Sequence, residues 1–339
     1  MAEKKRQHYV PQMYLRNFSI NEKNINVYSR DNCSLITATG SISKQCQKNY
    51  MYSQNLVFEN ALGDLETKTK PILSKIMNDC ILPKKNTADY WVLLNFILYQ
   101  ASRTLFAADD LNNTTETLLK TMLKEEIRLS GRTDISLEDI ERAKISYPEP
   151  AVFNIQMTSL MIPIIYDLGC KLIINNSLID FITSDNPVVF YNKYYINDFR
   201  SGTGLSNKGL LIFFPVSPKY SVVLFDKTIY RVGGKKTFGN IKVRNEEDIL
   251  QINALQIINS HQSFYAKHHR EQNIKRVCDI INNDHKMRNK PVENVSLRMK
   301  DGSIKKISCR FSKGKLNLIV TFVLLKIIKK IQKNYYRMA

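Results

Sequence analysis

Apolar residues recur at helical spacing through most of the first 170 positions of this chain. The stretches with this period are residues 56–77, 88–106, 111–129, 138–143 and 153–168. Apolar side chains three and four positions apart share one face of a helix, so each stretch predicts a helix. Pro71 is expected to kink or divide the first of them, because proline lacks the N–H that a helix interior uses. Residues 88–106 are apolar almost all round, which predicts a central helix.

After residue 170 the pattern changes to short apolar runs separated by turn residues. These runs cover residues 171–175, 179–183, 188–191, 210–214, 220–225 and 228–232. They predict strands, and an earlier pair at 25–28 and 34–39 predicts a hairpin. A helix is expected from residue 246 to about 268, capped by Asn245. This order is typical of an α+β fold, here a helical N-terminal half packed on a small antiparallel sheet.

The last part of the chain differs from the rest. Residues 295–307 predict a hairpin around the turn KDGS. Residues 316–331 predict an apolar helix followed by lysines, and its sixteen positions are marginal for a bilayer crossing, which takes ~20 apolar residues. We therefore divide the chain into an α+β domain at 1–270 and a basic C-terminal extension, with hairpin and helix, at 271–339.

Charge supports this division. Of the net charge of +19, residues 267–339 carry +14, from 19 Lys and Arg against 5 Asp and Glu. A basic tail with an apolar centre is expected to contact an anionic membrane surface or to pack on the body. Nucleic acid is the competing partner, but basic nucleic-acid arms usually lack ten consecutive uncharged apolar positions. The charge does not bear on the oligomeric state.

Six cysteines are spread widely along the chain, without a CxxC pair or a Cys/His metal spacing. The chain starts MAEKKRQ, which is not a secretory signal. Free thiols in a reduced, cytoplasmic setting are the natural interpretation. The basic tail would then place the protein at the inner face of the membrane.

Polar residues concentrate unusually in QHYVPQMYLRNF, residues 7–18. His8 is the only histidine of the first 260 residues, and imidazole is the side chain that titrates near neutral pH. Its role is either general acid–base catalysis or a structural hydrogen bond. Tyr9 and Gln12 beside it are candidate substrate contacts.

Four more positions are candidates. Gln100 and Arg103 share a face of the central helix, where a guanidinium requires an anionic ligand or an internal carboxylate. Asp185 follows an apolar run and precedes Asn186–Pro187, a strand end where a site or a plain turn is expected. Asn253 lies among apolar residues, where it contacts a ligand or serves as a buried structural amide.

Four segments resemble one known family. They are HYVPQ-x-YL-x-x-F at 8–18, SDNP at 184–187, FPVSP at 214–218 and INALQ at 252–256. Together they resemble a family of bacterial proteins, domain-of-unknown-function family 4238, over roughly the first 270 residues. The resemblance implies kinship and carries no established activity.

Two functions stay open. In the first, His8, Glu66 and Asp185 perform acid–base chemistry, with a divalent metal on the two carboxylates. The protein is then a hydrolase for an anionic, phosphate-containing substrate, in the manner of a nuclease, and Tyr9, Gln12, Gln100, Arg103 and Asn253 hold that substrate. In the second, it is a non-catalytic binding module for a small anion, a nucleotide or a protein partner. No GxGxxG, Walker, HExxH or GxSxG motif is present. Catalysis requires that the N-terminal segment folds inward to reach Arg103 and Asp185.

Overall fold

A computed structural model describes residues 5–54, 56–131, 134–195 and 202–285, and three short strands beyond them. Its α-helices are α1 (Gln12–Leu15), α2 (Val57–Asp79), α3 (Ala88–Ser102), α4 (Leu105–Ser130), α5 (Leu137–Arg142), α6 (Pro150–Met161), α7 (Glu246–Asn259) and α8 (Glu271–His285). Short 3-10 helices lie at η1 (Arg16–Phe18), η2 (Ile42–Lys44) and η3 (Ile162–Ile165). The mixture of helices and sheets confirms the α+β class.

One five-stranded sheet forms the centre of the fold. Its strands, in spatial order, are β11 (Phe238–Val243), β5 (Gly169–Asn175), β9 (Tyr220–Phe225), β8 (Leu211–Ser217) and β7 (Val189–Tyr191). Neighbours run antiparallel except for β11 and β5, which are parallel. The sheet is therefore mixed, and not purely antiparallel as expected. The difference comes from β11, which was not predicted and which pairs in parallel with β5 at one edge of the sheet.

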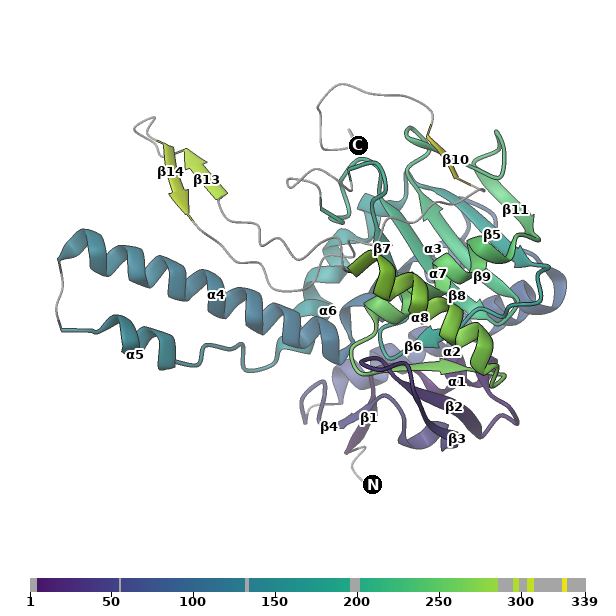
Figure 1. Cartoon of the computed structure of the whole chain (residues 1–339), viewed down its shortest axis with the longest axis horizontal. Coiled ribbons are helices and arrows are strands. Elements are labelled where there is room, and N and C mark those ends of the chain that lie inside the picture. Colours follow the sequence, from purple (N-terminus) through teal and green to yellow (C-terminus); the bar gives the residue numbers. More distant parts are fainter. Residues whose placement is uncertain are drawn as a thin grey trace.

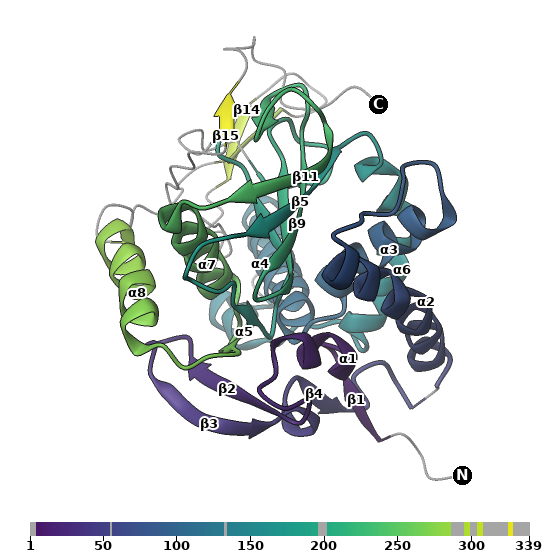
Figure 2. The same cartoon turned by 90° about the vertical axis from the view of Figure 1, so that its right-hand side faces the viewer.

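Helices cover both faces of this sheet (Figure 2). Alternate residues of β8 show the two sides: Ile212 and Phe214 join the core that contains α2, α3 and α6, whereas Leu211 and Phe213 join the core that contains α7 and α8. Such burial on both faces explains why the strands read as continuous apolar runs. Helices α4 and α5 project from this layered body (Figure 1).

A second sheet holds the N-terminal part of the chain against the rest. Its order is β3 (Leu35–Ser41), β2 (Asn24–Ser29), β12 (Ser263–Ala266) and β6 (Thr183–Ser184), all antiparallel. The predicted hairpin at 25–28 and 34–39 is thus confirmed as β2 and β3. Ahead of it, β1 (Arg6–His8) pairs with β4 (Gln47–Asn49). The segment that begins at Arg6 is therefore part of the fold.

Two predicted helices are shorter than expected. Residues 88–106 are not one helix, because α3 ends at Ser102 and Thr104 caps α4 by accepting the Ala107 N–H at 3.2 Å. The helix predicted to reach residue 268 ends at Asn259, and the following residues turn into β12. Pro71 does not divide α2, in which it occupies an exposed position.

The C-terminal predictions have different outcomes. Strands β13 (Val295–Arg298) and β14 (Ile304–Ile307) pair, which confirms the hairpin. The apolar helix predicted at 316–331 is wrong where the chain is described, because β15 (Leu325–Ile327) pairs with β10 (Tyr230–Val232). A short apolar run does not by its composition distinguish helix from strand. Residues 316–324 and 328–331 lie outside the described residues. Within the described part, none of the helices has the length and apolar content to span a membrane.

A disulfide joins Cys33, in the turn after β2, to Cys278 on α8, with 6.6 Å between their Cα atoms. The expectation of six free thiols is wrong for this pair, since residues 245 positions apart meet only in the folded chain. Cys46, Cys80 and Cys170 are free, and Cys309 lies outside the described residues. Helix α8 is therefore tied to the body, and the proposed domain division at residue 270 stays a prediction.

The disulfide is expected to stabilise the fold. Replacing both Cys33 and Cys278 by serine should lower the free energy of unfolding by about 2–4 kcal/mol, because the unfolded chain regains the freedom that the cross-link removes. Urea unfolding with and without a dithiol reductant measures this. The reductant should destabilise the wild type and leave the double variant unchanged; an equal response of the two proteins would show that the bond is not formed.

Candidate functional site

The N-terminal segment is anchored at the end of α3. Gln7 is fully buried, where its Oε1 accepts the N–H of Tyr52 at 2.7 Å. The hydroxyl of Tyr52 donates to the carbonyl oxygens of His8, at 3.4 Å, and of Arg103, at 3.3 Å. Nε2 of Gln100 donates to the carbonyl oxygen of Tyr9 at 3.0 Å. The segment thus folds inward to the end of α3, as predicted, but the predicted meeting of the His8 imidazole with the Asp185 carboxylate is not among the contacts of the described residues.

His8 is half-buried at the end of β1. Its Nε2 lies 3.2 Å from the carbonyl oxygen of Ser43 and 3.3 Å from Nε2 of Gln12. The protonated Nε2 donates to Ser43, whereas the other tautomer accepts from Gln12, so the two contacts alternate. Burial lowers the pKa of His8 below 6.5, and the Ser43 carbonyl and Glu66 only partly oppose this. His8 is therefore a neutral imidazole at pH 7, able to accept a proton.

Arg103 caps the C-terminus of α3 and is only 2% exposed. Its NH1 lies 2.8 Å from Oε1 of Glu66, while Nε and NH2 donate to Oε1 of Gln100 at 3.0 and 2.9 Å. Burying a guanidinium is costly without such partners. The Glu66 carboxylate, 28% exposed, is thereby fixed in place. Arg103 and Gln100 are too deeply buried for the substrate contacts predicted of them, and they position Glu66 and the Tyr9 backbone instead.

Three exposed cations lie close to His8 along the chain or next to the residues that contact it. Arg6 lies two residues earlier on the same strand and hence on the same face. Arg16 donates from NH2 to Oε1 of Gln12, and Lys44 directly follows Ser43. These charges favour the approach of an anion to the imidazole.

Asp185 has a structural role in this geometry. It is 2% exposed, and its carboxylate accepts the backbone N–H groups of His261 (2.8 Å), Gln262 (2.8 Å) and Ser263 (3.0 Å). Burial raises the pKa of this carboxyl, and the three N–H donors and His261 oppose the rise. Because both oxygens already hold the turn between α7 and β12, they are not placed for the catalysis or metal binding predicted of Asp185.

Tyr9 and Asn253 also differ from expectation. The Tyr9 side chain points into the protein, where it hydrogen-bonds Cys46, and burial raises the pKa of its phenol. Asn253 lies in the core on the α7 side of the sheet, not beside His8. Its Oδ1 accepts the Ile182 N–H at 3.2 Å and its Nδ2 donates to the Asp180 carbonyl at 2.9 Å. Of the predicted substrate contacts, Gln12 is the one whose side chain borders His8.

The predicted metal lacks ligands in the described part of the chain. No group of three or more His, Cys, Asp or Glu side chains there is arranged to hold a metal ion. Glu66 belongs to the Arg103 pair and Asp185 to the turn before β12. Two further residues of the site, Ser43 and Tyr52, were not found from the sequence. Ser43 contacts His8 through its backbone carbonyl, 35 positions away, and Tyr52 contacts Arg103 through its hydroxyl, 51 positions away. Contacts of this kind produce no recognisable sequence motif.

The fold and site together define an α+β protein in which an N-terminal strand is fastened to a buried Arg–Glu–Gln network. Residues 6–270 match the model of the family described as "Protein of unknown function (DUF4238)", and the chain belongs to this family. The match covers every predicted site residue. No curated protein and no solved structure matches the chain.

Proposed function

We propose that this protein is a hydrolase for an anionic, phosphate-containing substrate, with His8 as its acid–base group. The observation that carries the proposal is the neutral, half-buried imidazole of His8 within electrostatic reach of Glu66, whose carboxylate Arg103 holds in place. A base that is uncharged at neutral pH and accessible from solvent suits general base catalysis. Substrates of this class include phosphate esters and nucleic acids.

In the proposed reaction, His8 takes a proton from a water molecule as the water oxygen bonds to phosphorus. The bond from phosphorus to the ester oxygen breaks, and the leaving oxygen takes up a proton from the imidazolium or from solvent. Glu66 favours the imidazolium through its negative charge, which raises the pKa of His8. Arg6, Arg16 and Lys44 supply the positive charge that attracts the phosphate, and Gln12 orients the imidazole.

Replacing His8 by asparagine should lower kcat/KM by about 10²–10⁴-fold, the usual contribution of a positioned acid–base group. The measurement is a screen of p-nitrophenyl phosphate, bis-p-nitrophenyl phosphate and single-stranded RNA and DNA. Because the pKa of His8 is lowered from 6.5, activity should fall only as the pH drops below that value and His8 becomes protonated.

His269→Asn is the matched control, since His269 bonds Tyr28 at the far end of β2 and should leave the rate unchanged. A wild type that cleaves none of these substrates, or a His8→Asn variant as active as the wild type, contradicts the hydrolase proposal.

The alternative is a binding module without catalysis. It is favoured by one observation: Asp185, the second expected catalytic carboxylate, is fully engaged by backbone N–H groups. A small anion, a nucleotide or an acidic protein segment would then bind the cations around His8. Calorimetric binding of a nucleotide to a wild type that does not cleave it, weakened by Arg16→Gln and not by His8→Asn, would support this alternative.

The location of the protein stays a prediction. The cytoplasmic interpretation rested on free thiols, and the Cys33–Cys278 disulfide is of a kind that persists in oxidising compartments. The membrane-surface contact of the tail concerns residues that lie largely outside the described part of the chain.

A further inference from the structure

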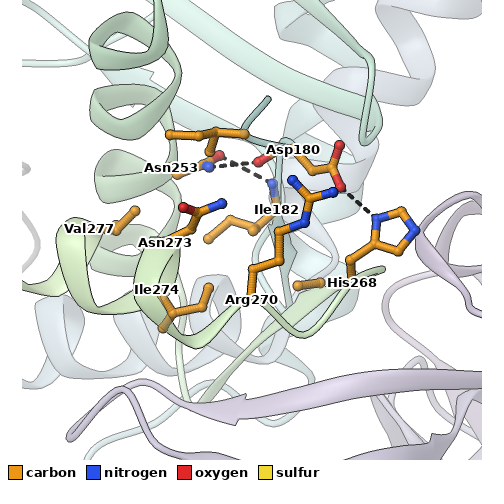
Figure 3. Close-up of a pocket in the computed structure, with 10 residues that line it drawn as sticks. Asp180, Ile182, Asn253, His268, Arg270, Asn273, Ile274 and Val277 are labelled. Carbon is orange, nitrogen blue, oxygen red and sulfur yellow. Dashed lines mark hydrogen bonds and ion pairs between the residues drawn. The ribbon is translucent and has the colours of Figure 1, made fainter. Parts of the chain in front are cut away.

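A pocket lies on the side of the central sheet that α7 and α8 cover (Figure 3), and neither His8 nor any residue that contacts it lines this pocket. Its buried lining residues, here called the floor, are the apolar Ile179, Ile182, Ala266, Ile274 and Val277 together with Asn253, whose amide is already bonded to the backbone of Ile182 and Asp180. Its more exposed lining residues, here called the rim, are Asp180, His268, Arg270 and Asn273. The basic sequence 267–270, which has no part in the proposed hydrolysis, thus borders a concave surface.

The acidic rim residue is already neutralised. Asp180 is 14% exposed; its Oδ2 lies 2.6 Å from Nδ1 of His268 and its Oδ1 3.2 Å from Nζ of Lys219. The carboxylate thereby fixes the His268 ring through Nδ1. The charge of Lys219 is by itself enough to balance that of Asp180, so the rim has no net negative charge that would repel an anion.

Arg270 gives the rim an excess of positive charge. Its NH1 donates to the carbonyl oxygen of Leu178, and its guanidinium lies over the pocket on the side of Asp180 (Figure 3). Its other N–H groups have no acceptor among the described residues, although a guanidinium has five donors. Asn273, on the first turn of α8, adds a side-chain amide beside it.

The volume of the pocket and its apolar floor indicate what kind of chemical group can lie inside it. The centre of a water-sized group can move within about 20 Å³ inside the pocket, which is enough space for one methyl-sized or water-sized group. Isoleucine and valine side chains offer no hydrogen bonds, so the inner group is apolar. The ligand is therefore an anion with a short hydrocarbon part.

We propose that this pocket binds a small aliphatic carboxylate. The carboxylate pairs with the planar guanidinium of Arg270 and accepts from the Asn273 amide, and its hydrocarbon end contacts Ile182 and Ile274. Guanidinium and carboxylate match as a two-bond pair. Inorganic phosphate, polar on all sides, leaves the apolar floor unused. This proposal is independent of the proposed hydrolysis at His8.

Titration of the full chain with butyrate, acetate and inorganic phosphate, followed by NMR of the side-chain amides and by calorimetry, tests it. Butyrate should bind saturably and at least threefold more tightly than acetate or phosphate, shifting the Asn273 amide signals. Arg270→Gln should weaken butyrate binding tenfold or more. Arg276→Gln, on α8 six residues after Arg270, is the matched control, because Arg276 pairs with Glu246 outside the pocket and the variant should bind butyrate as the wild type does.

The apolar floor is tested separately by Ile274→Thr, which should remove the preference for butyrate over acetate. Absence of saturable butyrate binding overturns the proposal. Phosphate binding as tight as butyrate binding, or an equal loss in the Arg270→Gln and Arg276→Gln variants, overturns it as well.

Discussion

Replacing Asp185 by alanine is expected to lower the free energy of unfolding by about 3–5 kcal/mol. The substitution leaves the N–H groups of His261, Gln262 and Ser263 without their acceptor, and a hydrogen bond to a charged group is worth ~1.5–3 kcal/mol. The expected loss is smaller than the sum of three such hydrogen bonds, because the folded Asp185→Ala variant no longer has to bury a carboxylate. Urea unfolding monitored by circular dichroism gives the value.

Asp185→Asn has nearly the same shape and separates packing from charge. Its amide has one acceptor oxygen and an NH2 group that would face backbone N–H donors, so it should be almost as destabilising as alanine. Asp64→Ala, on an exposed position of α2, is the control and should change stability by less than ~0.5 kcal/mol. A loss below ~1 kcal/mol for both Asp185 variants would show that the turn does not depend on this carboxylate.

Arg103→Met should cost about 3 kcal/mol or more. Methionine keeps most of the volume but leaves Gln100 and Glu66 without their donor, and removing one partner of a buried pair typically costs 3–5 kcal/mol. Water reaches Glu66, which is 28% exposed, so the lower end of that range applies. Combining it with Glu66→Gln should restore part of the loss, because the stranded carboxylate is gone.

The same variant has an effect that a purely structural residue would not produce. Arg103 contributes to the low pKa of His8, so the pKa of His8, measured by NMR, should rise when the guanidinium is removed. Arg142→Met is the control: it breaks an ion pair with Glu138 in which both side chains are more than three-quarters exposed, and should alter neither stability nor this pKa. An unchanged pKa in Arg103→Met would contradict the coupling between the two residues.

Local signals located most elements. The helices α2 and α5, the hairpin of β2 and β3, and the strands β5, β8 and β9 were all predicted within a few residues, because the period of apolar side chains reports which face is buried. The end of α4 was predicted as well, but its start was placed six residues too late. Errors occurred where a single polar side chain overrides the apolar pattern. Thr104 divides the helix expected at 88–106 by a local cap to the Ala107 N–H, and Asp185, 76 positions from His261, holds the turn that ends α7.

The sequence indicated which residues to consider for the candidate site better than it indicated the role of each. His8 was selected because imidazole titrates near neutral pH and Arg103 because it lies on an apolar helix, and the fold brings both within electrostatic range of Glu66. Asp185 was selected because it lies at the end of an apolar run before a proline turn, yet its oxygens hold three backbone N–H groups. A buried carboxylate requires donors, and the sequence cannot indicate whether they belong to the protein or to a ligand.

What the sequence alone determined is the α+β class, the kinship to the family and the residues that are candidates for functional chemistry, since these depend on period and residue type. Only the tertiary structure decided which of those residues meet: Cys33 with Cys278, Arg103 with Glu66, and His268 with Asp180 at the pocket beside α8. Each pair spans at least 37 positions, and contacts at such separation arise from the packing of whole elements.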